Sequence, residues 1–291
     1  MPSVKEFPGG IRCIDEVIFM RKKWLIPLIL LAAVIVLTLI GLDQRMIVRR
    51  YTVESDKITK PVRLAVVADY HGCDYGDALV PAVEALQPDA VLLPGDIFDD
   101  GMPWGPSEAL VRGLADKWPC YYVTGNHEYW SGRVPEICRI VEEAGAIVLD
   151  QNCSELTING QNLNLCGVPD PYAYVSTEAA LSRAAADIEQ EGYTVLLAHR
   201  PELIEKYAAT ASFDLVVAGH AHGGQVRIPF LINGLCAPNQ GWFPKYAGGR
   251  YALDGTTLIV SRGLSTQRQM GVPRIFNRPE LVLIEISPNG G

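Results

Sequence analysis

The chain contains five short apolar runs, and each of them is followed within three residues by a residue type that can bind a metal ion. The runs are the segments 64–68, 90–93, 120–123, 195–198 and 215–218. Each is too short for a typical helix and has the continuous apolar character of a strand that is buried on both faces. Helical patterns at 77–87 and 107–117 separate the first three runs, which favours right-handed crossovers in a largely parallel sheet. The sequence therefore predicts an α/β fold.

Polar side chains follow these predicted strands at their carboxyl ends. They are Asp69, His71, Asp96, Asp99, Asn126, His127, Glu128, His199, His220 and His222. All five histidines of the chain are among them, and none lies in a predicted helix or elsewhere in a loop. Binding sites in open α/β sheets form beyond the carboxyl ends of the strands. We therefore expect the five endings to converge in one crevice.

The segment 219–225, Gly-His-Ala-His-Gly-Gly-Gln, follows the last of these strands. Strand side chains alternate with period two, so His220 and His222 face the same way if the extended geometry continues through Ala221. Flanking glycines leave room for a metal or an anionic substrate to approach the backbone. Taken alone, the segment fits two turn histidines exposed to solvent better than a binding site.

Seven residues at these endings are candidate metal ligands: Asp69, His71, Asp96, Asn126, His199, His220 and His222. Seven are too many for one tetrahedral zinc ion and suit two divalent cations that share a carboxylate. A mixed Asp, Asn and His set fits Mn, Fe or Zn better than Ca or Mg. The chain contains no C-x-x-C pair, serine nucleophile elbow, P-loop or G-x-G-x-x-G motif, so those chemistries have no support.

Charge and cysteine usage limit the partners and the redox setting. The net charge is −8, and residues 1–50 hold eight basic against four acidic side chains, which leaves −12 on the remainder. This argues against nucleic acid as the main partner. The seven cysteines are scattered and odd in number, so we expect buried free thiols, which fit poorly with an oxidising exterior.

The segment 24–42 carries no charge and is apolar apart from Pro27, Thr38 and Gly41. As a helix it is about 28 Å long, close to the thickness of a bilayer core. We expect an uncleaved membrane anchor, with a buried core helix or a cleaved signal peptide as alternatives. Basic residues at 21–23 favour a cytoplasmic N-terminus and an extracytoplasmic main domain, and they make Met20 an alternative start.

The expected organisation is a tail at 1–23, the transmembrane anchor at 24–42, a connector at 43–60, the main domain at 61–287 and a frayed tail at 288–291. In the second half, β-type runs at 155–158 and 162–168 are joined by Asn159-Gly160, which predicts a hairpin with a type I′ turn. A helix is expected at 176–191. Further short strands are expected at 251–253, 257–260 and 281–286.

Five blocks in order resemble those of the calcineurin-like metallophosphoesterases: Asp69-x-His71, Gly95-Asp96-x-x-Asp99, 125–128 (Gly-Asn-His-Glu), His199 and Gly219-His220-x-His222. The resemblance covers residues 62–286. The run 219–227, with 260–264 and 278–281, is further similar to a membrane-anchored bacterial phosphodiesterase branch related to some UDP-2,3-diacylglucosamine hydrolases. The family implies a four-layer α/β sandwich of two packed mixed sheets flanked by helices, with a dinuclear metal centre.

Carried over residue by residue, the resemblance implies that Asp69, His71 and His222 hold the first metal and that Asp96 bridges the two. It assigns the second metal to Asn126, His199 and His220. It implies that His127 acts on the scissile phosphate as an acid or a transition-state donor. Asp99 and Glu128 either orient a histidine or a metal-bound water, or are solvated loop carboxylates.

The chain departs from the protein Ser/Thr phosphatases of this superfamily at two positions. Asp100 and Thr124 stand where those enzymes have arginines that grip a phosphate dianion. This favours a hydrolase of phosphodiester or pyrophosphate bonds. A phosphomonoesterase and a non-catalytic metal-dependent binding scaffold are the alternatives.

Other residues bear on the substrate. Arg200, Arg227 and Arg262 could replace the missing cations or could be packing arginines. Aromatic loops at 102–104 and 241–246 either meet lipid or a lipid-linked substrate, or pack onto the sheet.

Overall fold

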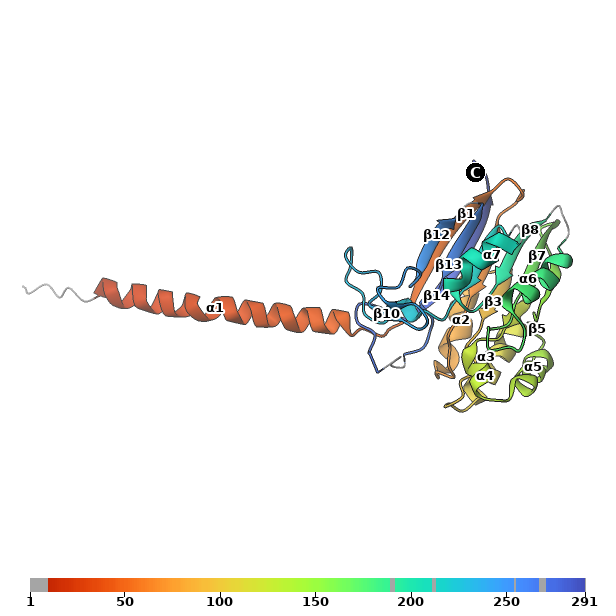
Figure 1. The fold of residues 1–291 in the computed structure, drawn as a ribbon. Coiled ribbons are helices and arrows are strands. Elements are labelled where there is room, and N and C mark those ends of the chain that lie inside the picture. Colours follow the sequence, from red (N-terminus) through yellow and green to blue (C-terminus); the bar gives the residue numbers. More distant parts are fainter. Residues whose placement is uncertain (1–9, 189–191, 211–212, 254, 267–270, 291) are drawn as a thin grey trace, which may run out of the picture. The chain divides into compact units, whose positions relative to one another are not determined.

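The computed structural model describes residues 10–188, 192–210, 213–253, 255–266 and 271–290, and for residues 10–24 and 210 it describes only the backbone. The chain divides into two compact units, Met1–Asp43 and Gln44–Gly291. The first unit contains helix α1, Gly10–Gly41, with Pro27 inside it (Figure 1). The helix covers 24–41 of the expected segment 24–42, and it also includes 10–23, which was expected as a tail.

Among the helices in the described ranges, none was identified as long and apolar enough to cross a membrane. The expectation of a transmembrane anchor at 24–42 is accordingly not confirmed.

The first sheet of the second unit has the strand order β1-β14-β2-β3-β4-β5. Its strands are β1 Ile47–Ser55, β14 Glu280–Pro288, β2 Val62–Val66, β3 Ala90–Pro94, β4 Cys120–Val123 and β5 Ile147–Val148. All neighbours are parallel except β14 and β2. The expectation of a connector at 43–60 is wrong over 47–55. There Tyr51 and Val53 pack against the core from an edge strand whose other face carries charged, exposed side chains such as Arg50 and Glu54, so its polar composition resembles a linker.

The second sheet has the order β12-β13-β9-β8-β7-β6. Its strands are β12 Gly249–Leu253, β13 Thr256–Val260, β9 Leu215–Ala218, β8 Tyr193–Leu197, β7 Gln161–Gly167 and β6 Asn152–Ile158. The β6–β7 hairpin is confirmed as an antiparallel pair. Asn159 and Gly160 have φ of 54° and 80°, the left-handed pair that a type I′ turn requires.

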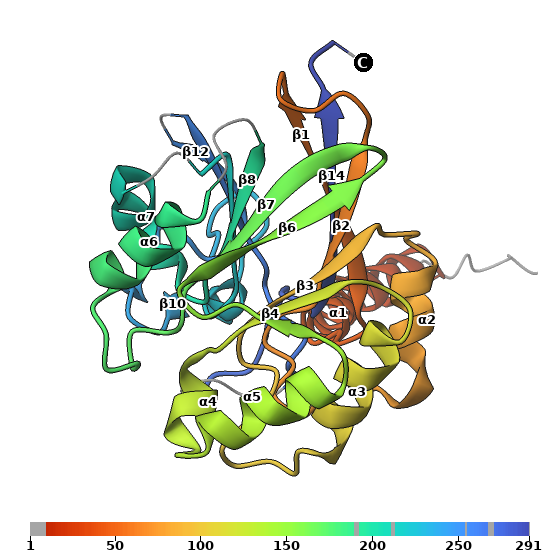
Figure 2. The same ribbon diagram turned by 90° about the vertical axis from the view of Figure 1, so that its right-hand side faces the viewer.

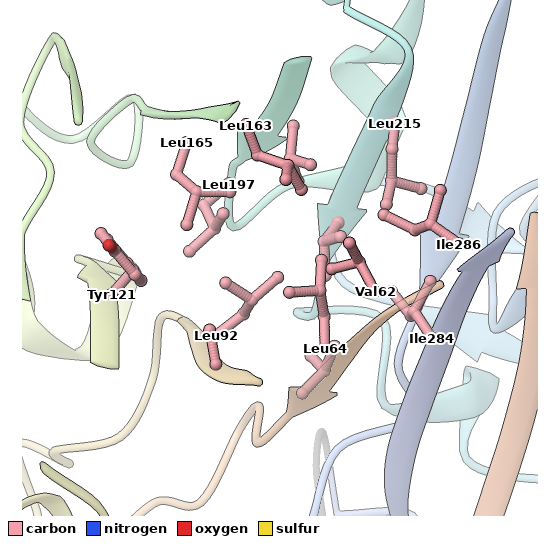
Figure 3. Close-up of a cluster of buried hydrophobic side chains, with 14 of the residues drawn as sticks. Val62, Leu64, Leu92, Tyr121, Leu163, Leu165, Leu197, Leu215, Ile284 and Ile286 are labelled. Carbon is pink, nitrogen blue, oxygen red and sulfur yellow. The ribbon is translucent and has the colours of Figure 1, made fainter. Parts of the chain in front are cut away.

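The two sheets pack face to face around an apolar core in which side chains such as Leu64 of β2 and Leu165 of β7 are fully buried (Figure 3). The outer face of the first sheet is covered by helices α2 Leu79–Glu84, α3 Gly105–Ala115 and α5 Val134–Glu143. The outer face of the second is covered by α6 Thr177–Ala186 and α7 Ile204–Thr210 (Figure 2). Two mixed sheets flanked by helices are the layers expected from the sequence. The far end of the helix expected at 176–191 lies at 189–191, outside the described residues.

One expectation about the cysteines is wrong. Cys153 and Cys166 are direct partners in the β6–β7 register and form a disulfide. Sequence spacing did not reveal the pair because only the hairpin register brings the two side chains together. Cys73, Cys120 and Cys236 are buried free thiols as expected, and Cys138 is a half-buried one.

Candidate metal centre

The candidate ligands lie on the loops that leave β2, β3, β4, β8 and β9, at the carboxyl ends of these strands. Five of the seven have a left-handed backbone: Asp69, His71, Asp96, His220 and His222, with φ between 46° and 66°. Residues other than glycine rarely adopt this region, at a cost of order 1–3 kcal/mol each, and such residues cluster at functional sites. The strands thus end in tight turns that direct these side chains inward.

Two groups of side chains share one carboxylate. Asp69, His71, Asp96 and His222 each offer a ligand atom, and these atoms all lie within 4.8 Å of one another. Asp96, His199 and His220 form a second group by the same measure, and every member of both is buried. Oδ2 of Asp96 is 3.6 Å from Nε2 of His71 and 3.1 Å from Nε2 of His199. Asp96 therefore lies between the two groups.

The expectation that His220 and His222 share a face through extended geometry is wrong. Ala221 between them has φ of −79° and ψ of −12°, and a 3₁₀ turn, η3, begins at once over His222–Gly224. This turn geometry sends His220 to the group of His199 and His222 to the group of His71. Period-two alternation failed here because the strand β9 ends at Ala218, before the first histidine.

Hydrogen bonds fix which ring nitrogens face the second group. Nδ1 of His199 is 2.9 Å from the Pro94 carbonyl oxygen, and Nε2 of His220 is 2.8 Å from Oδ1 of Asn239. Because both acceptors are oxygens, each of these nitrogens donates. The remaining nitrogens, Nε2 of His199 and Nδ1 of His220, are 3.1 Å apart. Oδ1 of Asn126 lies 3.2 Å from Nε2 of His199. The sequence did not predict Asn239 as part of the site, because no strand pattern precedes its loop.

The residues present fit a pair of divalent cations. Within the described residues, Oδ2 of Asp69 and Nδ1 of His222 are buried and have no hydrogen-bond partner. Buried polar atoms are normally paired, so orphans inside a cluster of ligand types indicate a site for an ion. A Cβ on Gly125 would lie 2.3 Å from Oδ1 of Asp96, so only glycine leaves room for this carboxylate.

Asp99 orients one candidate ligand. Its Oδ2 is 2.7 Å from Nδ1 of His71, and its Oδ1 accepts a hydrogen bond of 2.7 Å from the Gly101 amide. Burial opposes ionisation of Asp99, but the hydrogen bonds with His71 and the Gly101 amide, together with the charges of His71 and His127, lower the carboxyl pKa. Of the two alternatives for Asp99, the structure favours the orienting role.

Glu128 is fully buried and joins two of the ligand loops. Its carboxylate accepts hydrogen bonds from the amides of Asp96, Ile97, Phe98 and Gly125, at 2.8–3.1 Å. Burial and the charge of Asp96 raise its pKa to about 7. Glu128 is therefore not a solvated loop carboxylate, because it fixes the backbone on both sides of the shared Asp96.

His127 lies on the short helix α4, Asn126–Trp130, and is half-buried. Its Nδ1 is 2.7 Å from Oδ1 of Asp100 and 3.3 Å from Oδ2 of Asp99. Its ring meets that of His71 edge to face at 4.5 Å. With Nδ1 held by carboxylates, Nε2 is the nitrogen available to a reacting group.

The three arginines considered from the sequence are engaged elsewhere. Arg200 is buried and forms two hydrogen bonds, of 2.6 and 3.1 Å, with Asp170. Nε of Arg262 is 2.9 Å from Glu280. Arg227 donates to the Gly223 carbonyl and to the Asn233 side chain. These contacts favour packing roles.

The two aromatic loops differ. Trp104 donates to the Asp99 carbonyl at 3.0 Å and packs edge to face on Phe98, so the first loop is packed onto the fold. In the second loop, Trp242 of β11 (Gly241–Trp242, paired with β10, Cys236–Ala237) and Phe243 are 70% and 66% exposed. The second loop leaves more apolar surface accessible than the first, in which Met102 is 39% exposed.

Comparison with known proteins agrees with this geometry. Residues 62–224 match the family model described as calcineurin-like phosphoesterase. An uncharacterized metallophosphoesterase of Helicobacter pylori is 30% identical over 243 residues, which cover 80% of this chain and 62% of the relative. The chain thus spans less than two thirds of that relative. Phosphodiesterase YaeI of Escherichia coli is 26% identical over 236 residues, or 78% of this chain and 82% of the relative.

The structure of Haemophilus influenzae NAD nucleotidase matches 71% of this chain and 46% of its own, with a TM-score of 0.51 and 16% sequence identity. At this identity the likeness concerns the fold alone, namely the two mixed sheets flanked by helices.

Proposed function

The chain belongs to the calcineurin-like phosphoesterase family, and we propose from this premise that it is a metal-dependent hydrolase of phosphodiester or pyrophosphate bonds. The observation that carries the proposal is the pair of buried ligand groups that share Asp96. A relative named as a phosphodiesterase, similar over 78% of the chain, supports the same reaction class.

The proposed ligands are the members of the two groups together with Asn126, whose Oδ1 is 3.2 Å from Nε2 of His199. Asp69, His71 and His222 hold one divalent cation, and Asn126, His199 and His220 hold the other, with Asp96 between them. When bound, two such cations lower the pKa of a water molecule and withdraw charge from the phosphoryl oxygens. The donor set suits Mn, Fe or Zn.

The protein's own residues orient the reaction. Asp100 and Asp99 hold Nδ1 of His127, which leaves Nε2 free to face the substrate. From there Nε2 donates a proton to the leaving oxygen. Asp99 fixes His71, and Glu128 fixes the backbone amides beside Asp96. These contacts hold the site in one geometry before substrate binds, which reduces the entropy cost of reaching the transition state.

Charge near His127 supports diesters over monoesters. Asp99 and Asp100 both face this side of the site, and the arginines that could clamp a dianion are paired elsewhere. A monoester dianion would meet two carboxylates, whereas a diester carries one charge fewer.

The test is hydrolysis of bis(p-nitrophenyl) phosphate and p-nitrophenyl phosphate by the purified chain with Mn²⁺, Fe²⁺ or Zn²⁺. We expect the diester to be turned over with the higher kcat/KM and Asp96→Asn to lose both metal and activity. A protein that binds two metal ions yet hydrolyses neither ester with any of them would instead be a binding scaffold.

We further propose that the chain works at a membrane, on a phosphate ester that is lipid-linked. In support, the segment 24–42 carries no charge, and its apolar side chains over 25–40, such as Ile29 and Leu39, are exposed. Phe230, Trp242 and Phe243 of the main unit are also exposed, and aromatic residues favour bilayer interfaces. Flotation with lipid vesicles should recover the chain, and a variant without residues 1–43 should bind less. Equal recovery of both would contradict the role of that segment.

An extracytoplasmic location of the main unit is consistent with the Cys153–Cys166 disulfide, because disulfides persist in oxidising compartments. Thiol labelling before and after reduction, on protein isolated under acid quench, reads the state of this pair. A reduced pair in the cell would argue for the cytoplasmic side.

A further inference from the structure

An aromatic pocket of about 520 Å³ lies beside His127. Its walls include Trp130, Tyr172 and Tyr174, and Val134 and Pro135 add aliphatic surface. Among the residues that the structure describes, none that lines it is charged.

The aromatic pocket reaches the site through Trp130, whose ring contacts that of His127. A smaller polar cavity of about 360 Å³ includes Asp100, the partner of His127. Another cavity of about 520 Å³, next to α2 and α3, is lined by described residues that include none of these groups.

The first wall of this pocket is part of the same helix as His127. His127 and Trp130 are three residues apart on α4, which puts both on one face of the helix. Their ring centroids are 4.6 Å apart, and Trp130 meets Tyr172 edge to face at 5.7 Å. Trp130 therefore continues the surface that begins at the proton donor.

The opposite wall is tied to the metal centre through buried contacts. Asp170 is buried, accepts two hydrogen bonds from Arg200, and accepts the Tyr172 amide at 2.9 Å. The Arg200 guanidinium also lies 5.3 Å from the Tyr172 ring. Arg200 directly follows the candidate ligand His199. The pocket is thus built onto the site and is not a chance gap between loops.

We propose that this aromatic pocket binds the organic group on the leaving oxygen of the substrate, and that this group is a flat, uncharged ring system. The inference rests on the proposed function, because His127 donates to the leaving oxygen and the substituent of that oxygen must lie beyond His127. Trp130 and Tyr172 are half exposed, at 50% and 51%, and offer ring faces and edges for stacking. The uncharged lining disfavours a second phosphate or a carboxylate there.

The experiment compares two methyl phosphodiesters with different leaving groups, p-nitrophenol and trifluoroethanol, the latter followed by fluorine NMR. Trp130→Ala should lower kcat/KM about tenfold for the p-nitrophenyl ester and leave the trifluoroethyl ester within about twofold. Trp130→Phe should recover most of the loss. Ile147→Ala is the control, because Ile147 is exposed and does not line the pocket.

A parallel binding measurement separates failure of the pocket from failure of the hydrolase. The metal-loaded full chain is titrated with p-nitrophenol, at a pH where the phenol is neutral, and with trifluoroethanol. Binding of the phenol by the wild type and its loss in Trp130→Ala support the pocket even if no ester is hydrolysed. Equal phenol binding by both proteins, or equal losses for both esters, overturns the proposal.

Discussion

At the scale of single residues, the site depends on side chains that position other side chains. Three of the candidate histidines use one ring nitrogen in a hydrogen bond to a neighbouring oxygen, so that the other nitrogen faces the ligand group. The pairs are His199 with the Pro94 carbonyl, His220 with Asn239, and His71 with Asp99. This is how metal-binding histidines are usually held, because the outer hydrogen bond fixes the tautomer and the ring orientation. His127 has the same arrangement but sits at the edge of the ligand groups.

Replacement of His127 by alanine should separate catalysis from metal binding. We expect turnover of the diester to fall by ~10² or more, because the leaving oxygen loses its proton donor. Metal content should stay near two ions per chain, since His127 is not among the proposed ligands. Metal analysis and steady-state kinetics on the same preparation test this, and wild-type turnover in His127→Ala would refute the role.

Asp99 and Asp100 should respond differently to replacement by asparagine. Asp100 contacts His127 but not the candidate ligand His71, so Asp100→Asn should lower kcat with metal affinity unchanged. Asp99 also holds His71, so Asp99→Asn should weaken metal binding by ~10- to 100-fold as well. Metal titration of each variant is the measurement. Identical metal affinities in the two would show that Asp99 does not orient His71.

At the scale of elements, the strand ends and the loops after them decide the site. The apolar runs and their polar endings were readable from the sequence because burial on both faces leaves a continuous apolar segment. Three features were not readable. The left-handed turns that separate His220 from His222, the loop residue Asn239 and the Cys153–Cys166 pair all depend on tertiary contacts. Strand β1 was missed because an edge strand can carry a charged face.

Gly125 joins β4 to α4, and its replacement tests the close packing of these loops. A Cβ there would lie 2.3 Å from Oδ1 and 2.7 Å from the amide nitrogen of Asp96. Gly125→Ala should therefore displace the shared carboxylate, cost about 1–3 kcal/mol of unfolding free energy and lower metal content. Gly105→Ala is the control, because nothing lies within 4 Å of its Cβ position. Denaturant unfolding and metal analysis compare them, and two equally stable, fully loaded variants would contradict the expectation.

At the scale of the whole molecule, the two sheets bring carboxylates and histidines from distant segments into one buried cluster. Asp96 comes from the first sheet and His199 and His220 from the second. The interface between the sheets is apolar and stabilises the fold. The contribution of the buried carboxylates and histidines to stability depends instead on which of them are protonated. Metal binding and folding stability are therefore coupled through the same groups.

The stability of the metal-free protein should fall as pH rises from about 6.5 to about 10. Burial lowers the pKa of His199, but the charge and hydrogen bond of Asp96, together with the charges of Asp69 and Asp170, raise the pKa to about 10. A raised pKa contributes stability in full below the unfolded value of about 6.5, and this contribution is lost as pH passes the folded value. In the metal-loaded protein the cation takes the place of this proton beside Asp96, so its stability should vary less over the same window.

Thermal unfolding after chelation, at several pH values across that window, measures the effect. His199→Gln should have a shallower fall than the wild type, because it lacks the titrating group but keeps a side chain of similar size. The Gln variant also separates this effect from any other group that titrates in the window, since those groups remain. A metal-free wild type whose stability is constant or rises with pH would show that the His199–Asp96 pair does not hold a proton between the two sheets.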